Sequence, residues 1–197
     1  MSKHVAWLIV LAVLAVLTVC PLAQAIPPPW LLEGMKAKSD LILVAKMTKT
    51  EAAANAGRYN SRIGFEPVEI LKGKIDKKKD EEPKLFVLYY KRPEILAAFR
   101  PHVIGGTGHP KPADGELALI FLKKAAKDKH FAVVCGSFGY VGLKAATEDE
   151  LAKVKQRLAG FRKTCERIKD KKVREAMDGY YQKTLELVEK QAKGEKK

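Results

Sequence analysis

The clearest periodic pattern in the sequence lies near its C-terminal end and requires a helix with one buried side. Thr147 to Glu150, "TEDE", form a capping box, which typically opens a helix. Apolar side chains then recur at alternating steps of three and four residues: Leu151, Val154, Leu158, Phe161, Cys165 and Ile168. A helix with this stripe must bury it, either against the rest of its own chain or against another chain, and docking on its own chain is the simpler assumption.

A second apolar stripe follows the first with a different phase. The charged run Lys169 to Lys172 separates the two, and the second stripe comprises Val173, Met177, Tyr180, Thr184 and Leu187. Two helices fit this pattern, and so does one long helix whose buried side changes, so the sequence leaves both open. Residues 144–197 are therefore predicted to form a basic amphipathic helical extension of one or two helices.

Upstream of this extension, short β-prone runs alternate with turn-forming segments. The runs are "LILVAKMT" (41–48), "RIGFEPVEILKG" (62–73), "KLFVLYYK" (84–91), "ELALIFLKK" (116–124) and "HFAVVC" (130–135), and "GSFGYVGL" (136–143) adds a short edge strand. A short helix is predicted in "RPEILAAF", after the third run. Pro67 interrupts the second run, which predicts an edge or a bulge, and a bulge also explains the change of apolar phase after it.

Three strands, a short helix and two strands follow one another in the order of an OB-fold, a small Greek-key barrel. The segments "SDLILVAKMTK", "FEPVEILKGK", "GELALIFLKK" and "HFAVVCGSFGYV" resemble the amino-terminal domain of tissue inhibitors of metalloproteinases and the wider netrin-like module, including small exported bacterial relatives. The resemblance covers about residues 39–143. The expected fold class is therefore α+β, with a five-stranded OB-type Greek-key β-barrel followed by a C-terminal α-helical extension.

The resemblance also implies one alternative function. In the resembled inhibitors, a cysteine at the mature amino terminus presents its free amine and carbonyl to the zinc ion of the protease. Here the predicted first residue is Ile26, followed by Pro27, and no nearby cysteine fixes this segment to the barrel. A segment without such a tether loses ordering entropy on binding. Metalloprotease inhibition through Ile26 and Pro27 is therefore an alternative rather than the main expectation.

The first 25 residues have the features of an export signal. Lys3 and His4 precede the apolar run "VAWLIVLAVLAVLTV", and Ala23-Gln24-Ala25 provides a cleavage site with small residues at its first and third positions. Cleavage leaves Ile26 as the first residue and predicts a periplasmic or secreted protein. The alternatives are an uncleaved membrane anchor and lipid attachment at Cys20.

Residues 26–38 are predicted to be a Pro-rich leader between the signal and the barrel. The prolines of "IPPPW" fix φ and disfavour helix in the residue before each of them, so we expect an extended conformation. Trp30 and Leu31 are the first side chains expected to contact a core.

Two cysteines, Cys135 and Cys165, follow the predicted cleavage site. In an oxidising compartment they allow one disulfide, which would tie the last strand to the first helix of the extension. The alternative is that Cys165 is a buried thiol on an apolar stripe. Neither cysteine has a histidine at the spacing of a catalytic signature.

No sequence pattern predicts catalysis, a metal site or a cofactor. His102, His109 and Asp114 share one Gly- and Pro-rich loop, but they lack the spacing of zinc ligands, and loop polarity explains them better. The glycines of "VIGGTGHP" are not followed by the Gly-Lys-Ser/Thr of a phosphate loop. We therefore expect no enzymatic activity, no bound metal and no cofactor.

The chain carries 37 Lys and Arg residues against 23 Asp and Glu, a net charge of +14. This excess favours anionic partners, and Lys77, Lys78 and Lys79 are the candidate contact for an anionic envelope polymer. Nucleic acid is not an expected target of an exported protein, and membrane contact is expected only through an uncleaved signal segment. The main expectation is an exported, non-enzymatic binding or interaction module, with its ligand and its oligomeric state left open.

Overall fold

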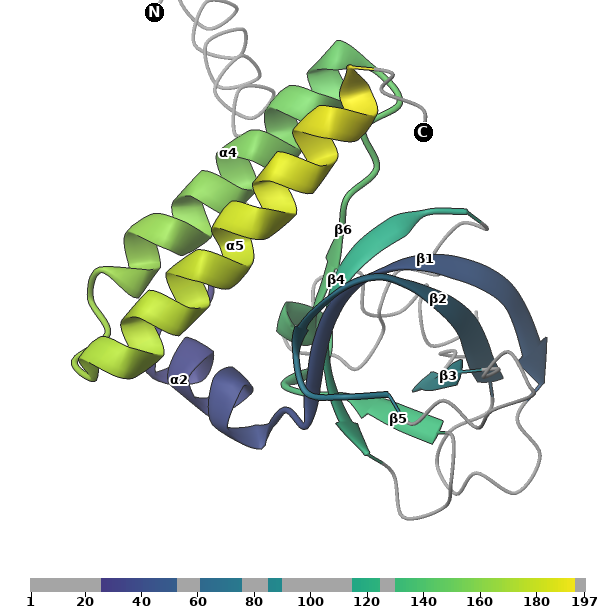
Figure 1. Ribbon diagram of the computed structural model, residues 1–197, viewed down its shortest axis with the longest axis horizontal. Helices are drawn as coiled ribbons and strands as arrows, with labels where there is room; N and C mark the ends of the chain where they lie inside the picture. Colours follow the sequence, from purple (N-terminus) through teal and green to yellow (C-terminus); the bar gives the residue numbers. More distant parts are fainter. Residues whose placement is uncertain (1–25, 53–60, 76–84, 90–114, 125–129, 194–197) are drawn as a thin grey trace, which may run out of the picture.

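The computed structural model describes residues 26–52, 61–75, 85–89, 115–124 and 130–193. These residues form an α+β structure in which the strands precede two long helices, as the sequence predicts (Figure 1). The short helix predicted in "RPEILAAF" lies outside the described residues. The elements in chain order are α2 (Pro29–Lys38), β1 (Leu41–Ala52), β2 (Ser61–Lys72), β3 (Leu85–Tyr89), β4 (Leu117–Lys124), β5 (His130–Val133), the 3-10 helix η1 (Gly136–Gly139), β6 (Tyr140–Gly142), α4 (Glu148–Cys165) and α5 (Lys171–Ala192).

The strands form one strongly curved sheet with the order β1-β2-β3-β5-β4-β6 and an additional β1–β4 pairing (Figure 1). β1 pairs antiparallel with β2 and with β4. β4 also pairs antiparallel with β5 and β6, while β3 pairs antiparallel with β2 and parallel with β5. All five strands expected from the sequence are present, and β6 is the short edge strand predicted after them.

Both faces of β1 and β4 are buried, which explains why their sequences are continuous apolar runs rather than alternating ones. Ile42 and Val44 belong to a core that lies beneath the helices, which we call the helix-side core. Leu43 and Ala45 belong to a second core on the opposite face of the sheet. The helices therefore dock on the protein's own sheet, as expected for their apolar stripes.

β2 is irregular where its apolar pattern changes phase. Its register with β1 shifts by one residue at Val68 and again at Leu71, so neither residue has a partner residue on β1. Pro67, which pairs with Ala45, lies directly beside the first shift. The bulge predicted from Pro67 is thus confirmed, and it accommodates a proline within the strand.

The Pro-rich leader is not extended throughout, because α2 begins at Pro29. Pro28 is the extended N-cap residue, with φ −66° and ψ 157°. A proline at the first helical position loses no hydrogen bond and already has the φ of a helix. Leu31 packs against the helix-side core and Leu32 is fully buried, but Trp30, also expected to contact a core, is 70% exposed. The predictions of an extended leader and of a buried Trp30 were therefore wrong.

Lys72 and Gly73, at the end of β2, contact the segment where α2 ends and β1 begins. The Lys72 ammonium donates hydrogen bonds to the backbone carbonyls of Lys36, at 2.8 Å, and of Ser39. A cation at this end also complements the helix dipole. Gly73 has a φ of 88°, and a Cβ atom there would lie 2.3 Å from the carbonyl oxygen of Asp40. The turn therefore needs glycine both for its conformation and for its close backbone approach.

The helical extension consists of two helices, which resolves the alternative that the sequence left open. α4 begins at the predicted capping box, where the Thr147 hydroxyl accepts a hydrogen bond from the Glu150 amide at 3.2 Å. The chain turns at residues 166–170, and the Asp170 carboxylate then accepts from the Val173 amide at 3.0 Å to open α5. Each helix thus starts with a side-chain cap.

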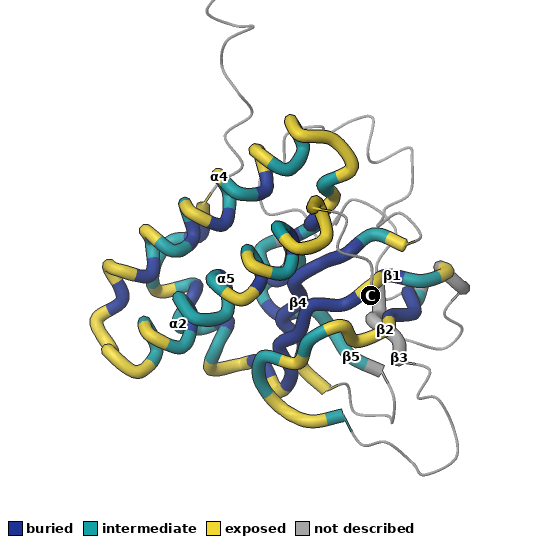
Figure 2. The backbone as a smooth tube through the Cα atoms, turned by 45° about the horizontal axis from the view of Figure 1, so that its top comes forward, coloured by how far each residue is buried: buried dark blue, intermediate teal, exposed yellow. Residues whose placement is uncertain are grey.

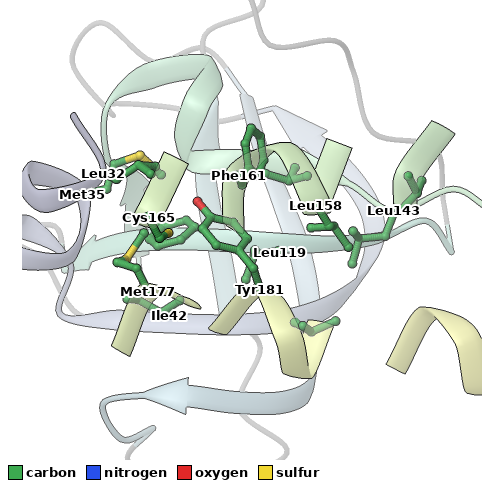
Figure 3. Packing of buried hydrophobic residues seen from close by; sticks show 14 of the residues in the cluster. Leu32, Met35, Ile42, Leu119, Leu143, Leu158, Phe161, Cys165, Met177 and Tyr181 are labelled. Carbon is green, nitrogen blue, oxygen red and sulfur yellow. The ribbon is translucent and has the colours of Figure 1, made fainter. Parts of the chain in front are cut away.

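Figure 2 shows the buried side of this helical hairpin facing the sheet. The α4 stripe is confirmed, since its buried residues are Val154, Leu158, Phe161 and Cys165, with Ile168 buried just after the helix. The α5 stripe was predicted with a small error of phase, because its buried residues are Met177, Tyr181, Thr184 and Val188. Tyr181 lies at the centre of this packing (Figure 3), with its ring centroid 5.0 Å from that of Phe161 and 6.4 Å from that of Phe121 on β4.

Candidate functional site

A shallow crevice of about 240 Å³ lies between the start of α4 and the end of α5. Lys155 and Glu189 in its wall form an ion pair at 2.9 Å, so a charged ligand would have to displace an existing contact. In the described residues, no group of three or more His, Cys, Asp or Glu side chains is placed to hold a metal. His102, His109 and Asp114 lie outside those residues.

Cys135 and Cys165 are both free thiols, so the disulfide that the sequence allows is not formed in this structure. Cys165 is buried in the helix-side core, and Cys135 is half-buried in a left-handed conformation, φ 58°, before η1. Burial raises the pKa of the Cys165 thiol to about 12, with a smaller contribution from the negative charge of Asp178. Because the thiolate is the reactive form, Cys165 is a packing residue, in agreement with the buried-thiol alternative.

We expect the two thiols to differ in reactivity. Burial also raises the pKa of the half-buried Cys135 thiol, so at neutral pH an alkylating reagent should modify Cys135 slowly in the folded protein, whereas Cys165 should react only after unfolding. The folded Cys165 pKa lies above its unfolded value, so its contribution to stability is complete below pH 9 and is lost as the pH rises towards 12. Mass spectrometry after native and denaturing alkylation measures both thiols, and a denatured chain with no reactive thiol would demonstrate a bridge instead.

The predicted mature amino terminus is held in place by packing. The Ile26 side chain lies against Gly160 of α4. The contact is close: a Cβ atom added at Gly160 would be 2.7 Å from the Ile26 Cδ1 atom. Pro27 is buried, while Ile26 remains 48% exposed. This segment therefore packs against α4 without a disulfide.

An exposed apolar surface lies on the second half of β2, and we call Pro67, Val68 and Ile70 the β2 ridge. The Val68 side chain is 45% exposed and that of Ile70 is 41% exposed, and Pro67 is exposed as well. β3 pairs with β2 only over residues 61–65, so among the described residues no strand pairs with the outer edge of β2 beyond Phe65. The ridge thus combines apolar side chains with a strand edge that none of the described strands pairs with. The sequence predicted the bulge but not the outward direction of these side chains.

The fold and these surfaces define an α+β protein with a curved sheet, a docked helical hairpin and an exposed apolar ridge. No protein-family model matches the chain, and no curated protein matches it either. Within the described ranges, none of the helices has both the length and the apolar character needed to cross a bilayer. Lys77, Lys78 and Lys79, the predicted polyanion contact, fall outside those ranges.

Proposed function

We propose that this chain is an exported, non-enzymatic binding module for a protein partner, built on an OB-type barrel of the netrin-like kind. The pairing of β1 with both β2 and β4, together with the parallel β3–β5 pair, supports the barrel. The signal-like composition of residues 1–25 supports export.

The β2 ridge carries the proposal of a protein partner. Exposed apolar side chains on a rigid element favour association, since they leave water on binding and lose little conformational freedom. Two contacts make this segment rigid. β1 pairs with it along its length, and Lys72 at its end donates a hydrogen bond to the end of α2. An unpaired strand edge can also accept an added strand from a partner through backbone hydrogen bonds.

A pull-down from the native envelope tests this function. The bait is the chain beginning at Ile26, washed at low and then high salt, and a specific protein partner should survive the high-salt wash. The double substitution V68S/I70S should abolish the capture, whereas A152S/A159S, which changes two exposed apolar side chains on α4, should leave it intact. A partner that the double variant retains, or one lost from every bait at high salt, would contradict the proposal.

A metalloprotease inhibitor acting through its mature amino terminus is the alternative function. Its specific support is the order of the segment: Pro27 is buried and Ile26 rests on Gly160, so this terminus need not lose much freedom on binding. An additional residue before Ile26 separates the two functions. The added residue would turn the Ile26 amine into a peptide bond and so abolish inhibition through that amine. It would leave binding through the β2 ridge unchanged.

Binding of an anionic envelope polymer is a second alternative, supported by the net charge of +14. It assigns the contact to Lys77, Lys78 and Lys79. Affinity for the polymer would then fall steeply with salt and with neutralisation of these three lysines, which neither of the other functions requires.

A further inference from the structure

The turn between α4 and α5 carries a cluster of exposed cations, which we call the basic tip: Lys163, Arg167, Lys169, Lys171 and Lys172. Residues 162–175 contain seven basic and three acidic side chains, a net charge of +4. The opposite end of the hairpin differs, because the equally long stretch 144–157 has four basic and three acidic side chains, a net charge of +1. Positive charge is therefore concentrated at one end of a rigid hairpin.

The acidic groups near the basic tip form ion pairs with few of its cations. Glu166, within the turn, is exposed and has no ion-pair partner among the described residues, so it lowers the net charge without pairing with a particular cation. Asp170 caps the first turn of α5, and Asp178 is held by Arg162 at 2.7 Å. Lys171 makes an exposed ion pair with Glu175 at 3.8 Å, a contact of little energetic weight. Among the described residues, Lys163, Arg167, Lys169 and Lys172 have no ion-pair partner.

The position of two of these lysines is unfavourable for the helix itself. Lys171 and Lys172 are the first two residues of α5, and its first turn contains no acidic residue. The positive end of the helix dipole repels cations there, and an acidic residue would stabilise the same turn. The Asp170 carboxylate at the N-cap offsets part of this repulsion, but the two lysines are themselves unfavourable there, which is common where residues serve binding rather than folding.

Trp30 belongs to α2, and this helix lies near the basic tip. α2 packs beside the end of the hairpin that contains the turn (Figures 1 and 2), and its Leu32 and Met35 lie near Cys165 and Met177 (Figure 3). Trp30, in the first turn of this helix, is 70% exposed. The helix beside the basic tip thus carries an exposed tryptophan.

The shape of this region indicates the kind of partner. The crevice described above lies at the opposite end of the hairpin, whereas the basic tip is a turn at the far end of the two helices (Figure 1), and all five of its cations are exposed. Exposed cations on a turn, together with an exposed tryptophan on the adjoining helix, suit an extended anionic surface with an apolar interior, since tryptophan is favoured at the level of lipid headgroups. We propose that the basic tip and Trp30 bind the surface of a membrane that contains anionic phospholipids. This inference does not depend on the β2 ridge or its partner.

Vesicle sedimentation tests the proposal with the chain that begins at Ile26. Both core clusters consist of later residues, so this chain contains all of them. Vesicles of phosphatidylcholine mixed with phosphatidylglycerol should bind it at low salt, and vesicles of phosphatidylcholine alone should not. The triple substitution K163Q/K169Q/K172Q should lower the partition coefficient by about 100-fold, since each cation near an anionic surface contributes about fivefold.

The matched control is K153Q/K190Q/K193Q, which removes the same charge from exposed lysines at the other end of the hairpin. This control variant should reduce binding by less than about threefold, because the three substituted lysines would lie away from the membrane surface. W30A should weaken the binding that remains at higher salt. Equal losses for the two triple variants would overturn the proposal by assigning binding to net charge alone. Retention of soluble polyphosphate by the basic tip, without binding to anionic vesicles, would overturn it as well.

Discussion

Replacing Gly73 with alanine should lower the free energy of unfolding by about 2–4 kcal/mol, a combined estimate for a left-handed residue and a steric clash. The φ of 88° disfavours any residue with a Cβ atom, and that atom would lie 2.3 Å from the backbone carbonyl oxygen of Asp40. Because the clash is with a backbone atom, rotation of a side chain cannot relieve it. Urea unfolding followed by circular dichroism measures the change.

Gly34→Ala is the matched control for this substitution. Gly34 lies within α2, and nothing is within 4 Å of the position that its Cβ atom would take. Alanine should therefore stabilise the protein by up to about 1 kcal/mol, because it restricts the unfolded chain and favours helix. Similar effects of the two substitutions would show that the turn after Lys72 does not require a left-handed residue.

Tyr181→Ala should cost about 3–5 kcal/mol, the range observed when a large buried aromatic side chain is truncated. Tyr181 is fully buried and contacts Phe161 on α4 and Phe121 on β4. Its removal should therefore weaken both the hairpin and the docking of the hairpin on the sheet. The midpoint of urea unfolding should fall and, if the hairpin detaches first, the helical and aromatic signals should separate.

Tyr181→Phe separates the contribution of the ring from that of the hydroxyl. The hydroxyl oxygen is buried and has no hydrogen-bond partner among the described residues, and burial raises the pKa of this phenol well above its ordinary value. Removing an unsatisfied buried hydroxyl should leave stability unchanged or increase it by up to about 1 kcal/mol. A clear loss of stability in this variant would reveal a partner for the hydroxyl, such as a buried water molecule.

Local patterns in the sequence predicted much of the secondary structure. The capping box at Thr147 and the repeat from Val154 to Ile168 located α4 because both signals act within a few residues. The bulge at Val68 was also predictable, since Pro67 cannot occupy a regular interior position of a sheet. The α+β class followed from the order of the runs, whereas the barrel stays a proposal.

Features that depend on distant contacts were not predictable in the same way. α2 was missed because its stability comes from Leu32 and Met35 packing against the hairpin, and a run of prolines seemed to exclude a helix. The outward direction of Val68 and Ile70 depends on the register with β1. The one available signal for the β2 ridge was Pro67, which indicates an edge but not which side chains are exposed.

The contact of α2 with the hairpin also determines when this protein can fold. A ten-residue helix is too short to persist alone in water, and α2 relies on Leu32 and Met35 meeting residues such as Cys165 and Met177 near the other end of the chain. Synthesis and any translocation deliver the amino terminus first, so α2 must wait until the hairpin has emerged. Assembly should therefore be a late, concerted event, slowed by the long chain segment that has to close between these partners.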